Sequence, residues 1–211
     1  MSRTLVDAAA SRGLVLVALL AFVGTAAADD ADLEWIDRDA IEAGEIAVRT
    51  SIDSGTVTVD TAALIDAPPQ AIWAVLTACE DAPEFVPNVL ACERIERLED
   101  GRAELFVQTI KPIFFIPRFD YVFRLDYTPY ERIDMTRISG APVHRMAGTW
   151  RFLRQTGGAV LLVHHFEVEP AVPIPRFMVR ATLRRDLTKT MEALRERVEG
   201  RVDGRADASK N

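Results

Sequence analysis

Near its carboxyl end the chain reads VRATLRRDLTKTMEALRERV, from Val179 to Val198. Apolar residues recur here at spacings of four, four, four, three and four positions, which places them along one stripe of a helix. The stripe consists of Val179, Leu183, Leu187, Met191, Leu194 and Val198. Arginine and glutamate alternate on the other faces, which favours a solvated helix surface over a nucleic-acid-binding one. Pro173 and Pro175 predict where the helix begins.

Upstream of this helix, six segments have the character of antiparallel β-strands. Phe119–Thr128 alternates most clearly, because its odd positions are aromatic or apolar and its even positions are mostly polar. One face of the sheet is therefore expected to be buried and the other solvated. Gly157 and Gly158 mark the turn before the last strand. The predicted strands are 89–98, 102–111, 119–128, 131–138, 146–154 and 159–169.

A first strand and two short helices precede this set. Residues 55–65 alternate β-branched residues and predict a strand. Pro68 and Pro69 open a short helix, and residues 81–87 suit a second one. The chain is thus predicted to be α+β, with seven antiparallel strands. A sheet of this size curls, and the terminal helix is the only predicted element able to cover its apolar face.

The first residues look like a secretory signal peptide. Arg3 and Arg12 precede the apolar run Leu14–Val23, and three alanines, residues 26–28, form a cleavage site. The alternative is an uncleaved anchor, but the uncharged stretch of 16 residues falls short of the roughly 20 that span a bilayer. We therefore expect secretion across the inner membrane, into the periplasm. The predicted divisions are a signal peptide at 1–28, an N-terminal extension at 29–54, one domain at 55–200 and a polar tail at 201–211.

Composition narrows the class of protein. Of 211 residues 49% are apolar, enough for a core, and the net charge of −7 argues against a nucleic-acid partner. Two cysteines cannot build a disulfide-rich scaffold or a four-cysteine zinc site. In an exported domain two cysteines commonly pair, which predicts a Cys79–Cys92 disulfide, with two buried free thiols as the alternative.

Several runs of residues carry a family resemblance. They are IDAPPQAIWAVL (Ile65–Leu76), PEFVPNV (Pro83–Val89), Ser139-Gly140 and GTWRF (Gly148–Phe152). The chain resembles the START-like, or SRPBCC, superfamily, and within it the polyketide cyclase/dehydrase and coenzyme Q-binding START-domain proteins. That resemblance implies a helix-grip fold, in which a seven-stranded curved antiparallel sheet wraps a long C-terminal helix. It also implies a deep apolar cavity between the two.

Strand direction places the entrance of such a cavity. Segments 111–118, 139–147 and 170–176 are expected at one end of the sheet, and the first and last are unusually apolar. Phe114 and Phe115 then form a lid or a lipid-contacting surface, or they fold inward and plug the core; both readings stay open. The expected residues of the cavity and its mouth are Phe114, Phe115, His164, Phe166, Phe177, Leu183 and Leu187.

The sequence contains few features that would indicate an enzyme. No phosphate loop, nucleophile elbow or metal-ligand spacing occurs, so no cofactor or metal is expected. His164 shares the apolar side of its strand and is the best acid–base candidate, against the plainer reading of a core histidine. Gln108 could be a polar group of the cavity or an ordinary surface residue.

We therefore expect a soluble exported carrier of a hydrophobic ligand, such as a lipid, a quinone or a sterol-like molecule, with transient membrane contact. The alternative is an aromatase/cyclase-type enzyme acting on a bound polyketide-like substrate.

Overall fold

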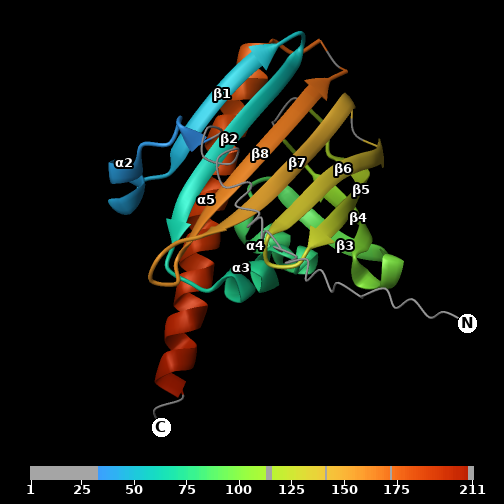
Figure 1. Ribbon diagram of the computed structural model, residues 1–211. Coiled ribbons are helices and arrows are strands. Elements are labelled where there is room, and N and C mark those ends of the chain that lie inside the picture. Colours follow the sequence, from blue (N-terminus) through green and yellow to red (C-terminus); the bar gives the residue numbers. More distant parts are fainter. Residues whose placement is uncertain (1–32, 113–115, 141, 172, 209–211) are drawn as a thin grey trace, which may run out of the picture. The chain divides into compact units, whose positions relative to one another are not determined.

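The computed structural model describes residues 33–112, 116–140, 142–171 and 173–208. It divides into two units, the first ending at Glu34 and the second beginning at Trp35. The predicted signal peptide, residues 1–28, lies outside the described residues. The second unit contains the whole sheet and the long terminal helix (Figure 1).

Eight strands form one antiparallel sheet in the order β1-β2-β8-β7-β6-β5-β4-β3. They are β1 (Ala47–Asp53), β2 (Thr56–Ile65), β3 (Val89–Leu98), β4 (Ala103–Ile110), β5 (Phe119–Thr128), β6 (Arg132–Gly140), β7 (Val143–Arg154) and β8 (Val160–Pro170). The helices are α2 (Arg38–Glu42), α3 (Pro69–Leu76), α4 (Ala82–Phe85) and α5 (Arg176–Ala208), with short 3-10 turns η2 (Cys79–Asp81) and η3 (Glu99–Gly101). The α+β architecture and the element order predicted from the sequence are confirmed.

The predicted number of strands was wrong by one. Residues 47–53, assigned to a partly helical extension, form the edge strand β1, which pairs with β2 along its whole length. Val48 and Ile52 are the only large apolar residues in β1, and its second half is exposed. An edge strand that buries so little lacks the alternation by which a strand is recognised in a sequence.

α5 lies against one face of the sheet (Figure 1). Met191, Leu194 and Val198 from the predicted stripe are fully buried in the core, beside Ile65 and Ile72. Each such side chain stabilises the fold by about 1.5–3 kcal/mol relative to an exposed one. The stripe therefore performs the covering role that the sequence predicts.

The helix also runs further than predicted. Gly200 was taken as the end of the domain and residues 201–211 as a tail, yet α5 continues to Ala208. Tertiary contacts explain the difference, because Val202 packs against the core and Arg201 donates to Asp81 at 3.2 Å. Local helix-breaking residues do not end a helix whose side chains are held in this way.

Further contacts fix this half of α5 to the short helices. Arg197 pairs with Asp81 at 2.9 Å and with Glu84 at 2.7 Å. Glu199 accepts a hydrogen bond from the backbone of Asp66 at 3.0 Å. The carboxyl-terminal half of α5 is thus anchored by packing and by charge, whereas its amino-terminal half faces a different environment.

Candidate functional site

An apolar cavity lies between the amino-terminal half of α5 and the sheet. Its volume is about 260 Å³, close to the lower end of the roughly 300–1,000 Å³ typical of small-molecule sites. β4, β5, β7 and β8 contribute one wall, α5 another, and the turn between α4 and β3 a third. Large apolar side chains that face the cavity include Ile110, Phe119, Met146, Phe166, Leu183 and Leu187.

The stripe on α5 changes its role along the helix. Leu183 and Leu187 line the cavity and are only half-buried, as is Val179. One turn further on, Met191 and Leu194 have no exposed surface. Since all of these residues share one face of the helix, the change reflects the space beneath them rather than their chemistry. The interior is hollow at one end of the molecule and packed at the other.

Three connections between the elements contribute residues to the cavity lining. Pro112 and Ile116 come from the β4–β5 connection, Pro142 from the β6–β7 connection, and Ile174 from the β8–α5 connection. These three connections belong to the segments that the sequence places at one end of the sheet.

The end of β6 requires a glycine where it pairs with β5. Gly140 has a φ of +70°, and a Cβ there would collide with the backbone of Asp120 and Tyr121. Glycine alone combines this left-handed conformation with so close an approach to a neighbouring strand. Gly140 therefore lets the end of β6 lie close against β5, and Pro142 and Val143 further along the chain line the cavity.

The structure separates the predicted cavity residues into groups. Phe166, Leu183 and Leu187 line the cavity. Phe177, in the first turn of α5, is 63% exposed and stands outside the lining. Phe114 and Phe115 lie outside the described residues, so both readings of their role stay predictions.

His164 lies on the inner face of the sheet but not in the cavity wall. It is 6% exposed, and its ring stacks on Trp150 with 3.8 Å between ring centroids and 7° between planes. Phe166, whose ring centroid is 6.0 Å away, does line the cavity. Burial lowers the pKa of His164 to about 3, helped by the nearby His165, so the imidazole is neutral at ordinary pH.

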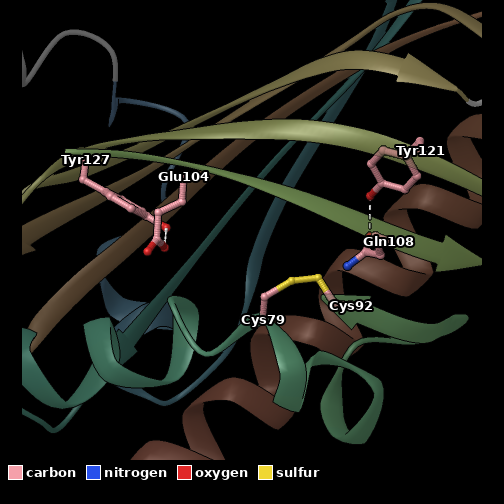
Figure 2. Close-up of a disulfide and its surroundings, with 6 residues drawn as sticks. All are labelled: Cys79, Cys92, Glu104, Gln108, Tyr121 and Tyr127. Carbon is pink, nitrogen blue, oxygen red and sulfur yellow. Dashed lines mark hydrogen bonds between the residues drawn. A yellow bond between two sulfur atoms is a disulfide. The ribbon is translucent and has the colours of Figure 1, made fainter. Parts of the chain in front are cut away.

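Two hydrogen-bonded pairs contribute polar groups to the lining, which also includes Thr182 and Thr190. Tyr121 and Gln108 face each other on β5 and β4, and the tyrosine hydroxyl donates to the glutamine Oε1 (Figure 2). On the other side, Asn88 donates to Asp186 at 2.6 Å. Whether Gln108 belongs to the cavity was left open by the sequence, and Tyr121, Asn88 and Asp186 were not predicted as cavity residues. Asp186 does carry a signal, because it is a charged residue directly beside the inner stripe of the helix.

A disulfide secures the third wall. Cys79 and Cys92 are joined, with their Cα atoms 5.4 Å apart (Figure 2). The bridge ties η2 to β3, and the chain between the two cysteines includes the cavity-lining residues 86–89. The pairing expected from the sequence therefore falls at the edge of the candidate site.

A second polar cluster occupies the opposite end of β4. Glu104 is 5% exposed and accepts hydrogen bonds from Tyr127 at 2.9 Å and Arg97 at 3.0 Å, with Arg94 at 3.2 Å. Burial, and then the hydrogen bond to Glu104, raise the pKa of Tyr127. Figure 2 shows Glu104 and Tyr127 of this cluster, and the Gln108–Tyr121 pair, at the two ends of the same strands. Every group in the cluster has a partner, which suits a structural role.

The described residues contain no group of three or more histidine, cysteine, aspartate or glutamate side chains that could hold a metal ion. Over the same residues, no helix combines the length and the apolar character needed to cross a membrane.

Solved structures share this fold. The Zhui aromatase/cyclase from Streptomyces sp. R1128 aligns with a TM-score of 0.61 at 18% identity, over 70% of this chain and 96% of its own. A START superfamily protein from Mycobacterium smegmatis aligns with a TM-score of 0.60 at 21% identity, over 68% of this chain and 97% of its own. The STAR-related lipid transfer protein from Xanthomonas axonopodis aligns with a TM-score of 0.60 at 16% identity, over 73% of this chain and 92% of its own. At these identities the likeness establishes the helix-grip fold alone.

No curated protein matches the sequence. The family model for polyketide cyclase/dehydrase and lipid transport, however, matches residues 65–195, which include every strand from β3 to β8 and most of α5. With the fold, the cavity and this match in agreement, the chain belongs to the polyketide cyclase/dehydrase and lipid transport family.

Proposed function

We propose that this protein binds a hydrophobic molecule in the cavity beneath α5 and carries it through water outside the cytoplasm. The observation that carries the proposal is the change from a packed to a hollow interior along one helical stripe. An apolar molecule that enters the cavity leaves water, which contributes about 25 cal/mol for each Å² of apolar surface buried.

Filling the cavity tests this proposal. Leu187→Trp adds volume where the interior is hollow, so we expect near-native thermal stability and weakened binding of the neutral fluorescent dye N-phenyl-naphthylamine. Leu194→Trp is the matched control, because Leu194 lies on the same stripe in the packed core. There the added volume is expected to cost about 1–3 kcal/mol of stability. Equal loss of stability in both variants, with no dye binding by the parent at micromolar concentration, would refute the carrier.

Export is part of the proposal. The predicted signal peptide supports it, and so does the Cys79–Cys92 bridge, because structural disulfides persist mainly in oxidising compartments. A periplasmic carrier would move apolar molecules between two membranes. This also distinguishes the carrier from a cyclase, whose polyketide substrates are built on cytoplasmic carriers.

Membrane contact at the cavity mouth would load the carrier. Phe177, in the first turn of α5, is exposed, and Arg176 and Arg118 adjoin connections that contribute to the cavity lining. An aromatic side chain among cations suits the surface of an anionic bilayer. We expect Phe177→Ser to slow dye transfer from vesicles that contain phosphatidylglycerol while leaving equilibrium capacity intact. Ile95→Ser, at an exposed apolar residue of β3, is the control. Equal rates of dye transfer for Phe177→Ser and the parent would show that Phe177 does not contribute to membrane contact.

The second candidate is an aromatase/cyclase-type enzyme. The similarity to the Zhui aromatase/cyclase favours it, and Gln108 and Tyr121 would be the polar groups in contact with substrate. Native mass spectrometry separates the two candidates. A co-purified molecule that is released with its mass unchanged after incubation supports the carrier, whereas its conversion by loss of water supports the cyclase.

A further inference from the structure

The Gln108–Tyr121 pair leaves one set of hydrogen-bond donors unused on the sheet side of the cavity. The hydroxyl proton of Tyr121 is committed to the Oε1 of Gln108. Burial raises the pKa of Tyr121, so this hydroxyl stays protonated. The amide nitrogen of Gln108 can only donate, and no described residue accepts a hydrogen bond from it. A ligand that reaches this wall therefore meets N–H donors.

The helix side of the cavity carries a negative charge. The carboxylate of Asp186 is 16% exposed and faces the cavity. Its Oδ2 accepts from Asn88 at 2.6 Å and its Oδ1 from Arg185 at 2.8 Å, so each oxygen already has one donor. Arg185, which forms this ion pair, is 57% exposed and is not part of the cavity lining, so the carboxylate of Asp186 is the member of the pair that faces the cavity.

These two walls set opposite conditions for the polar end of a ligand. A ligand carbonyl oxygen at Gln108 would accept a hydrogen bond from the side-chain amide nitrogen, and because it is uncharged no ion would have to be desolvated. A carboxylate would lose its hydration in an apolar cavity and would also meet the like charge of Asp186. Burying an unpaired anion under these conditions is strongly unfavourable.

We propose that the ligand is an uncharged amphiphile, whose apolar body fills the cavity and whose carbonyl oxygen accepts hydrogen bonds from the side-chain amide of Gln108, and that Asp186 excludes carboxylates. This inference rests on the proposed function, since it defines the class of molecule that the same cavity carries.

Three probes with ten carbon atoms each test this inference: decane, methyl octyl ketone and decanoate. The affinity of each probe is measured by its displacement of N-phenyl-naphthylamine at pH 8, where decanoate is ionised. Gln108→Leu is expected to lower the affinity for the ketone relative to decane about tenfold, in line with the loss of one buried hydrogen bond. Asp186→Asn is expected to raise the affinity for decanoate relative to the ketone by about tenfold. Glu192→Gln, on the exposed face of α5, is the control and should leave both ratios unchanged.

A second variant guards against a loss of folding. Gln108→Leu alone leaves the Tyr121 hydroxyl without its partner, whereas the double variant Gln108→Leu/Tyr121→Phe removes both polar groups together. The double variant should show the same lowered ratio of ketone to decane affinity. If decane and the ketone bind but these ratios match those of the parent, the inference is overturned and the carrier stands. If the parent binds the dye but no probe displaces it, the inference is overturned and the carrier stands. If the parent binds neither the dye nor any probe, both are overturned.

Discussion

His164 is a buried base that the fold keeps neutral. Its pKa is about 3, against an ordinary value of 6.5, because burial disfavours the charged imidazolium. Between these values the unfolded chain binds a proton that the native protein does not. Stability therefore rises with pH across this window and is lost as the pH falls below 6.5, by at most about 1.4 kcal/mol per pH unit.

Replacing this histidine should flatten that dependence. His164→Phe retains an aromatic ring against Trp150 and removes the proton-binding site. Urea unfolding at a series of pH values from 4 to 7 should give a smaller slope of free energy against pH than in the parent. His144→Gln, at an exposed histidine, should keep the parent's slope. Equal slopes for His164→Phe and the parent would show that His164 is protonated in the native state.

Glu104 tests whether the second polar cluster is structural. It bonds to Tyr127 of β5 and to two arginines of β3, so it joins three strands through one carboxylate. Glu104→Gln should destabilise the protein by about 1–3 kcal/mol, because a neutral amide cannot satisfy all three donors. Urea unfolding measures the loss, with exposed Glu96→Gln as the control. Unchanged dye binding in the folded variant would agree with a role outside the site.

Among the elements, the segment from η2 to β3 depends most on a covalent link. The Cys79–Cys92 bridge has a sequence separation of 13 residues, and closing a loop of this size stabilises a protein by about 3 kcal/mol in the chain-entropy estimate. The double variant Cys79→Ala/Cys92→Ala should lose stability of this order in urea unfolding. Dye binding should weaken as well, since the cavity residues 86–89 lie inside the loop. A variant as stable as the parent would show that the bridge contributes little.

Elements that bury a face were predictable from the sequence, and those without one were not. The regular spacing of apolar residues predicts both α5 and β5, and in each element the face that carries these residues is the buried one. β1 was missed because an edge strand needs only backbone pairing with β2. The end of α5 was misplaced because Arg201 and Val202 are held by distant partners. Such contacts have no local pattern.

The candidate site divides in the same way. Leu183, Leu187 and Phe166 follow from the parity of their elements, and they line the cavity. Gln108 and Asp186 do not follow from parity, because a polar residue at an inner position is recognised only when its partner is known. Those partners come from other elements: Tyr121 lies 13 residues from Gln108, and Asn88 lies 98 residues from Asp186.

At the scale of the whole molecule, stability and binding occupy different ends of one interior. The packed end holds Met191, Leu194 and Val198 together with the ion pairs of Arg197, so it can supply the folding energy. The hollow end holds a cavity of about 260 Å³, whose lining includes Pro112, Pro142 and Pro170. Because Met191, Leu194 and Val198 are fully buried away from the cavity lining, an empty cavity need not compromise the fold. This division is what a protein needs if it must stay folded both with and without its cargo.

Export and disulfide formation should succeed or fail together. Produced from the full sequence in a bacterium with a periplasm, the protein should have an intact mass that lacks residues 1–28, and non-reducing peptide mapping should link Cys79 to Cys92. Ala28→Trp, which removes the small residue at the cleavage site, should leave the precursor uncleaved. A form that begins at Asp29 without the leader should stay in the cytoplasm with both thiols free, because that compartment keeps cysteines reduced. A full-length cytoplasmic product from the complete sequence, with quantitatively free thiols, would refute the extracytoplasmic role and leave the cavity to serve a ligand inside the cell.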